Sequence, residues 1–174
     1  MTETSRRAER VAGSATLFFL CGKMASGKST LAQELAAREN ALLLGEDELL
    51  SALYPGEVVD VPTYAKYSSR IRNALTPLIC TVLSEGLSIV LDFPANTRNQ
   101  RVWFRGLSEA SAVGHELHFI DAPDSVCKRQ LRERSQALPE GTRWTSDVEF
   151  DTITAYFEPP SAEEGFTVVV HRRS

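Results

Sequence analysis

The chain has 174 residues, of which 43% are hydrophobic and 24% charged, an ordinary composition for a globular protein with one buried core. No apolar run approaches the roughly 20 residues that span a bilayer. The start of the chain also lacks the apolar segment of a secretory signal, so we expect a cytoplasmic protein without membrane contact. The formal net charge of −4 argues against a large nucleic-acid footprint, although a local basic patch is compatible with it.

The chain opens with a polar stretch and then a short apolar run. Residues 1–15 carry three arginines but little to bury, and we expect a flexible leader there. The apolar, β-favouring residues at 17–21 predict the first buried strand. A single domain is therefore expected over residues 16–174.

A phosphate-binding motif follows this strand directly. Four residues separate Gly22 from the run Gly27-Lys28-Ser29, the spacing of a P-loop, in which successive backbone N–H groups point at nucleotide phosphates. We expect Lys28 to reach the outer phosphates, Ser29 to hold Mg²⁺, and the following helix to point its positive end at the same anion. The expected ATP-binding residues are Gly22, Lys23, Met24, Ala25, Ser26, Gly27, Lys28, Ser29 and Thr30.

The remaining chain alternates between helical and strand-like patterns. Apolar residues at helical spacing predict helices at 31–40, 46–53, 64–82, 98–113, 123–138 and 146–157. Short apolar runs predict buried strands at 41–44, 87–91, 116–120 and 166–170. Pro77 lies inside the longest helical pattern and is expected to kink it. This alternation predicts an α/β fold with a parallel sheet, helices on both faces, and ligands beyond the carboxyl ends of the strands.

Three features together carry a family resemblance: the P-loop, aspartates at two strand ends, and the closing segment FEPP…EEGF at 157–166. The chain resembles the small single-domain P-loop kinases. Within these it is similar to AAA_33-type ATP-binding proteins, which are grouped with zeta-toxin-like, gluconate-kinase-like and polynucleotide-kinase-like enzymes, many without an assigned substrate. The resemblance covers residues 16–171. It implies the P-loop NTPase fold, a three-layer α/β/α sandwich whose five parallel strands lie in the order 2-3-1-4-5, with a helical lid before the last strand.

Two carboxylates at strand ends suit phosphoryl transfer, which requires neutralised phosphate charge and a group that takes the proton of the attacking hydroxyl. Asp92 ends an apolar strand, and we expect it to orient Mg²⁺ beside Ser29, although in related kinases this position can touch the acceptor instead. Asp47 matches the position of the general base in related kinases. Glu46 and Glu48 flank it, so the base within this trio stays open, and a favourable first-turn charge is the alternative.

A basic cluster follows the fourth predicted strand, where the resemblance places the lid. It consists of Lys128, Arg129, Arg132 and Arg134. We expect Arg129 and Arg132, three residues apart, to bind phosphate oxygens, with Arg132 also stabilising the transition state. The alternative is a solvated charged face.

A second basic set follows Asp92 and could line the acceptor site. It comprises Arg98, Arg101 and Arg105, at spacings of three and four, and Asn96 precedes it in the connecting loop. If Asn96, Arg98 and Arg101 meet an acceptor, that acceptor is polar or anionic. A plain helix surface accounts for the same pattern equally well.

The function expected from these features is an ATP- and Mg²⁺-dependent kinase that phosphorylates a hydroxyl of a small polar molecule, with Asp47 as base. A polynucleotide 5′-hydroxyl kinase is the nearest alternative, which the acidic composition disfavours. A toxin-like kinase acting on a nucleotide sugar is a further one by resemblance. A third alternative is a regulatory module that binds a nucleoside triphosphate without transferring phosphate. The chain has no N-K-x-D guanine-recognition sequence, which disfavours a Ras-type GTPase.

Overall fold

The computed structural model describes residues 15–136 and 146–174. The leader expected at 1–15 and the segment 137–145 of the lid region lie outside the described residues, apart from Ala15, which is buried against the core. The described chain runs through the elements β1 (Thr16–Cys21), α2 (Lys28–Glu39), β2 (Leu42–Gly45), α3 (Glu46–Leu53), α4 (Val61–Ser84), β3 (Ile89–Asp92), α5 (Arg98–Ser111), β4 (Gly114–Asp121), α6 (Asp124–Gln136), α7 (Asp147–Thr154), η1 (Ala162–Glu164) and β5 (Val168–Arg172).

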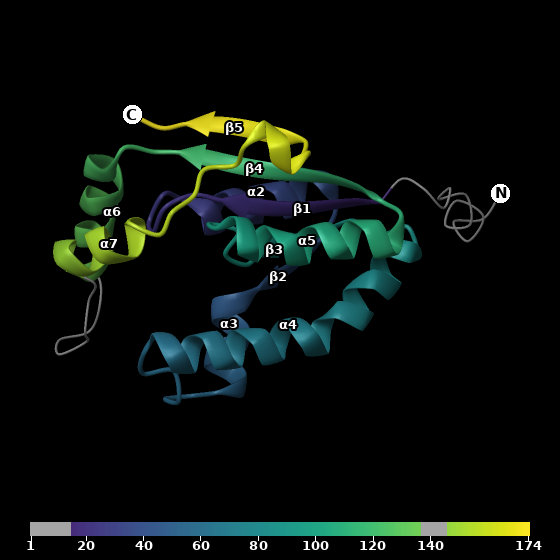
Figure 1. Ribbon diagram of the computed structural model, residues 1–174, viewed down its shortest axis with the longest axis horizontal. Helices are drawn as coiled ribbons and strands as arrows, with labels where there is room; N and C mark the ends of the chain where they lie inside the picture. The colour runs from purple at the N-terminus through teal and green to yellow at the C-terminus, as the bar shows by residue number, and fades with distance from the viewer. Residues whose placement is uncertain (1–14, 137–145) are drawn as a thin grey trace.

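The five strands form one parallel sheet in the order β2-β3-β1-β4-β5, as the resemblance implied. Helices cover both of its faces (Figure 1). Alternate residues of β1 divide between two apolar clusters, because successive side chains of a strand point to opposite faces. Leu17 and Phe19 pack with α4 and α5 on one face, and Phe18 and Leu20 pack with α2, α6 and α7 on the other. The expected α/β/α sandwich is confirmed.

Local signals in the sequence set where several helices begin. Capping boxes open α4, α5 and α7, where the side chains of Asp60, Thr97 and Ser146 each accept a hydrogen bond from the backbone three residues on. Pro77 is accommodated inside α4, and Figure 1 shows this helix changing direction in its C-terminal half. Within the described residues, no helix is both long enough and apolar enough to cross a membrane.

Three strand predictions need correction. The strand expected at 87–91 spans Ile89–Asp92, and Leu87 lies outside it, 44% exposed. The run at 41–44 was expected to be buried, yet β2 is an edge strand, shifted by one residue, with Leu42 45% exposed. The last strand was expected at 166–170 but spans Val168–Arg172, because the Phe166 side chain packs edge-on against Phe19 before the pairing with β4 begins. An apolar run signals burial of side chains, and it does not locate the backbone pairing.

Strand register brings the two predicted carboxylates to the same place. Gly45, the last residue of β2, pairs with Asp92, the last residue of β3. The chain then turns directly into α3, so Asp47 in its first turn follows the sheet edge at which Asp92 ends. β1 lies on the other side of β3 and delivers the P-loop to the same edge.

Candidate functional site

The P-loop adopts a conformation that depends on its glycines. A Cβ atom on Gly22 would come within 2.7 Å of the Ser26 hydroxyl and 3.1 Å of the Ile120 carbonyl, so only glycine fits there. Gly27 has φ +98°, and Ala25 also lies in the left-handed region at φ 56°. Left-handed residues within a loop turn successive N–H groups toward one concave side, the geometry that binds anions.

Lys28 holds its ammonium group inside this loop. Nζ donates hydrogen bonds to the carbonyl oxygens of Gly22 (2.6 Å) and Lys23 (2.8 Å). Burial lowers the pKa of Lys28, while the nearby carboxylate of Asp92 opposes that effect. The charge is therefore held at the centre of the loop, where phosphate oxygens would replace the backbone carbonyls as its partners.

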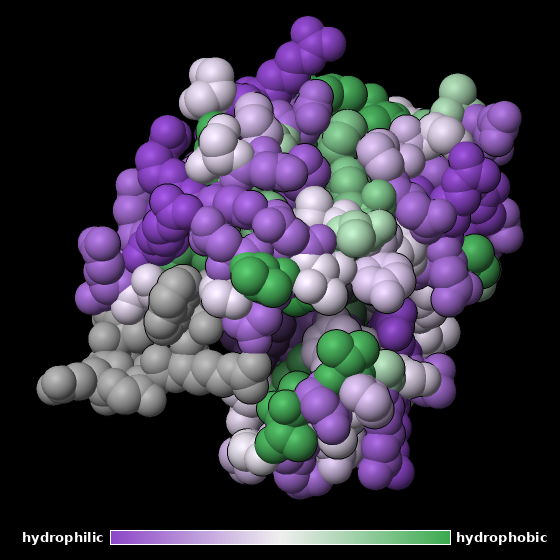
Figure 2. Space-filling view, turned by 60° about the vertical axis from the view of Figure 1, so that its left-hand side comes forward, coloured by the Kyte–Doolittle hydropathy of each residue, from purple (hydrophilic) through white to green (hydrophobic). Residues whose placement is uncertain are grey.

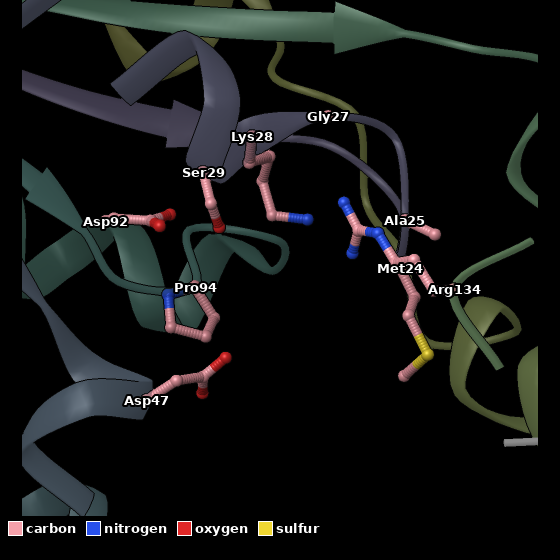
Figure 3. A pocket seen from close by; sticks show the side chains of 9 residues that line it. All are labelled: Met24, Ala25, Gly27, Lys28, Ser29, Asp47, Asp92, Pro94 and Arg134. Atoms are coloured by element: carbon pink, nitrogen blue, oxygen red, sulfur yellow. The ribbon is translucent and has the colours of Figure 1, made fainter. Parts of the chain in front are cut away.

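A pocket of about 160 Å³ opens beside the loop and combines phosphate-binding and acidic groups. Its walls are formed by Met24, Ala25, Gly27, Lys28, Ser29, Asp47, Asp92, Pro94 and Arg134. Figure 3 shows Lys28, Ser29 and Asp92 on one side of this space, and Asp47 across it beyond Pro94. The structure thus brings together the P-loop and both carboxylates predicted from the sequence.

The other P-loop residues have more peripheral positions. Lys23 pairs with Asp124 at the start of α6 (2.5 Å), and Thr30 is exposed in the first turn of α2. Ser26 is buried, and its hydroxyl has no hydrogen-bond partner among the described residues. Gly22 and Ser26 shape the loop, whereas Met24, Ala25, Gly27, Lys28 and Ser29 face the pocket.

Asp47 lies at the solvent-accessible mouth of the pocket. Partial burial there raises the pKa of its carboxyl group, the negative charge of Asp92 raises it further, and Lys28 opposes both. A carboxylate with a raised pKa is a better proton acceptor than an ordinary surface aspartate. This raised pKa makes Asp47 a candidate proton acceptor.

Ser29 and Asp92 fit a magnesium ion. Both line the pocket, and Figure 3 shows the Asp92 carboxylate directed toward the Ser29 hydroxyl. Mg²⁺ prefers oxygen ligands and usually keeps several waters, taking its other ligands from substrate phosphates. Within the described part of the chain, no group of three or more His, Cys, Asp and Glu side chains could hold a metal by itself, so an ion here would depend on the nucleotide.

The arginine that lines the pocket is Arg134, whereas the sequence analysis expected Arg129 and Arg132 to bind phosphate. Arg134 lines the pocket, whereas Arg132 donates to Asp147 on α7 and Arg129 is exposed outside the pocket lining. Residues two apart on a helix point about 200° apart, so Arg132 and Arg134 cannot share a face. Arg134 thus brings the predicted cluster to the pocket, whereas the roles expected of Arg129 and Arg132 stay predictions.

The predicted acceptor residues are engaged elsewhere. Asn96 accepts a hydrogen bond from the Gly22 amide (3.0 Å) and braces the P-loop. Arg98 donates to Ser161 (3.2 Å). Arg101 is 0% exposed and forms a two-pronged ion pair with Glu164, at 2.6 and 2.8 Å. The prediction that Arg101 meets an acceptor is wrong, because its side chain lies in the interior.

Glu46 is a structurally important residue whose position the sequence did not reveal. It is 1% exposed and accepts hydrogen bonds from the hydroxyls of Tyr64 and Ser68 on α4, both at 2.5 Å. These two hydrogen bonds hold α3 against α4 at the residue that precedes Asp47. The available signal was Tyr64 and Ser68 at a spacing of four, which places both hydroxyls on one face of a helix.

The parallel sheet order, the P-loop at the end of its central strand and the carboxylates beside it define a P-loop kinase-like α/β protein. The AAA domain family AAA_33 matches residues 17–160, and the chain belongs to this family. No curated protein sequence matches the chain significantly.

Solved structures show the same fold at low sequence identity. A candidate kinase from Chloroflexus aurantiacus has a TM-score of 0.71 and 18% identity, over 91% of this chain and 88% of that one. A gluconokinase from Sinorhizobium meliloti 1021 has a TM-score of 0.59 and 16% identity, over 91% and 83%. The Mycobacterium tuberculosis APS kinase CysC, in complex with AMPPNP and APS, has a TM-score of 0.59 and 17% identity, over 93% and 91%.

Proposed function

We propose that this protein is an ATP- and Mg²⁺-dependent kinase that transfers the γ-phosphoryl group of ATP to a hydroxyl of a small polar molecule. The observation that carries the proposal is the single pocket that joins the P-loop to Asp47 and Asp92. A P-loop alone is shared by switches, motors and transferases. An accessible carboxylate with a raised pKa, across the pocket from the phosphate loop, adds the base that transfer to a hydroxyl needs.

Each charged or hydroxyl-bearing pocket residue has a role in this proposal. The loop amides and Lys28 bind the phosphates, and Ser29 and Asp92 would hold Mg²⁺, whose charge would offset that of the phosphates. Asp47 accepts the proton of the acceptor hydroxyl. The oxygen of that hydroxyl bonds to the γ-phosphorus, and ADP leaves. Arg134 supplies the guanidinium group that the sequence had assigned to Arg132.

Production of ADP in the presence of candidate acceptors tests the proposal. Sugars, amino sugars, nucleosides, antibiotics and 5′-hydroxyl oligonucleotides are compared, with Lys28→Ala as the blank. We expect at least one small hydroxyl compound to raise ADP formation in the natural protein and not in the blank. Nucleotide binding with no rise for any acceptor class would favour a regulatory module.

Oligonucleotide binding distinguishes a polynucleotide kinase from a kinase that acts on a small molecule. A polynucleotide kinase neutralises several backbone phosphates, so its affinity falls steeply with salt. We expect no such affinity, because the acidic chain brings only one described arginine to the pocket lining.

A further inference from the structure

The acceptor side of the pocket is the wall opposite the P-loop. In Figure 3, Asp47 and Pro94 face the space below Lys28 and Ser29, and the Met24 side chain extends toward the same level from the other side. Arg134 reaches in beside Lys28, on the phosphate side. An acceptor whose hydroxyl bonds to Asp47 and lies in line with a phosphate on the loop would therefore occupy a space lined by Asp47 and by the apolar side chains of Pro94 and Met24.

The arginines that follow this wall in sequence, on α5, have their contacts in the C-terminal part of the chain. Arg98, 54% exposed, lies 3.7 Å from Glu163. Arg101 is fully buried, and besides Glu164 it donates to the carbonyl oxygens of Ala95 (2.8 Å) and Glu158 (2.9 Å). Arg105 lies over the Phe166 ring, 4.7 Å from its centroid. Each of the three arginines of α5 thus contacts a residue within 158–166, and none of them lines the pocket.

Among the described lining residues, the cations Lys28 and Arg134 lie on the phosphate side of the pocket, and the charged groups beside Pro94 are carboxylates. Asp47 and Asp92 lie on either side of Pro94, and Glu48 adds an exposed carboxylate in the same first turn of α3. The end of α3, the connection that follows it and the start of α4 carry exposed apolar side chains, and Figure 2 shows green atoms gathered in the lower part of that face. They are Leu53, Val58, Val59 and Val61. An anionic acceptor bound beside Pro94 would meet the carboxylates of Asp47 and Asp92.

We propose that the acceptor is an alcohol without anionic groups, either neutral or amine-bearing, and that the site rejects carboxylated and phosphorylated acceptors. This deepens the proposed kinase function and rests on it. Two observations carry it: the pairing of the α5 arginines with the C-terminal segment, and the two carboxylates that flank Pro94. Because like charges at short range repel, anions are excluded from the place where the attacking hydroxyl must lie.

Charged thiol reagents measure this property without knowledge of the acceptor. Pro94→Cys introduces a thiol between the two carboxylates, in a Cys80→Ala background, since Cys21 and Cys127 are buried. The control is Leu78→Cys, a site on α4 that is 55% exposed and whose helical neighbours Ala74, Leu75, Thr81 and Val82 are uncharged. Rates are measured with a cationic and an anionic methanethiosulfonate of similar size.

The cationic-to-anionic rate ratio should be roughly threefold to tenfold higher at position 94 than at position 78, the effect of a nearby charge in a solvated site. Asp47→Asn should lower that ratio. A ratio at position 94 equal to or below that of the control overturns the proposal. Met24→Cys provides a second probe, from the P-loop side of the same pocket, if the Pro94 variant is unstable.

A matched set of acceptors links the charge preference to catalysis. A neutral sugar, its amino derivative and its acid derivative are compared in the ADP assay. Faster transfer to the neutral or amino form supports the proposal, and faster transfer to the acid form overturns it. The cationic reagent can react faster at position 94 while no compound is phosphorylated. In that case the proposed kinase activity is contradicted, and the negative charge of this side of the pocket is supported.

Discussion

Arg101 shows how a charged side chain can be part of the fold rather than of the site. Its guanidinium group is completely buried and donates to both carboxylate oxygens of Glu164 and to two backbone carbonyls. Glu164 has a lowered pKa, mainly because of its hydrogen bonds with Arg101. The pair connects α5 to the segment that precedes β5.

Removal of this guanidinium should destabilise the protein strongly. We expect Arg101→Ala to lower the free energy of unfolding by about 3 to 5 kcal/mol, because it leaves a mostly buried carboxylate unpaired. Arg98→Ala is the matched control on the same helix, at an exposed ion pair, and should cost less than about 1 kcal/mol. Urea unfolding measures both, and equal losses would show that the buried pair has no special role.

The ionised carboxylate of Asp47 should lower the free energy of unfolding, although the proposed reaction needs it as a base. Because its pKa is raised in the folded protein, the folded state binds more protons than the unfolded state, and stability falls as the pH rises above the ordinary value of 3.8. We expect Asp47→Asn to stabilise the protein at pH 7 by less than about 1 kcal/mol, since the residue keeps contact with solvent. Thermal unfolding should show that the gain disappears below pH 3.8, and a gain independent of pH would contradict the raised pKa.

At the scale of elements, α3 and α4 are joined through Glu46. We expect Tyr64→Phe and Ser68→Ala each to lower the free energy of unfolding by about 1 to 3 kcal/mol, because each removes a donor from a buried carboxylate. Thr81→Ala serves as control, since its exposed hydroxyl bonds only within α4, and should change stability by less than about 0.5 kcal/mol. If Glu46 also positions Asp47, both variants lower kcat more than they raise KM, and unchanged kcat in both would restrict Glu46 to a structural role.

Elements with strong local signals could be predicted from the sequence, whereas features set by distant contacts could not. The P-loop is predictable because its function depends on backbone geometry, which Gly22 and Gly27 encode within six residues. The start of α5 was likewise predicted at residue 98, where Thr97 and Gln100 form a capping box. The hydrogen-bond partners of Arg98 and Arg101 were not predicted, because they lie about sixty residues later in the chain. Helical spacing indicates a shared face but not what covers that face.

At the scale of the whole molecule, binding of nucleotide to the P-loop should stabilise the folded state. A ligand that binds only the folded protein at one hundred times its Kd adds about 2.7 kcal/mol. We expect Mg·ADP to raise Tm in the natural protein and to have little effect on Lys28→Ala. Differential scanning fluorimetry provides the measurement, with AMP as a control that lacks the outer phosphates. Equal shifts in the two proteins would mean that the nucleotide binds elsewhere.

The fold places the P-loop at the end of central β1, and the strand pairing of Gly45 with Asp92 adds the acidic residues to the same edge of the sheet. The central claim is that Asp47 takes the proton of the acceptor hydroxyl. The most direct test is acceptor-stimulated ADP formation by the natural protein and Asp47→Asn at saturating Mg·ATP. We expect Asp47→Asn to bind nucleotide with unchanged affinity and to transfer about 10² to 10⁴ times more slowly. Transfer at the rate of the natural protein would contradict the account.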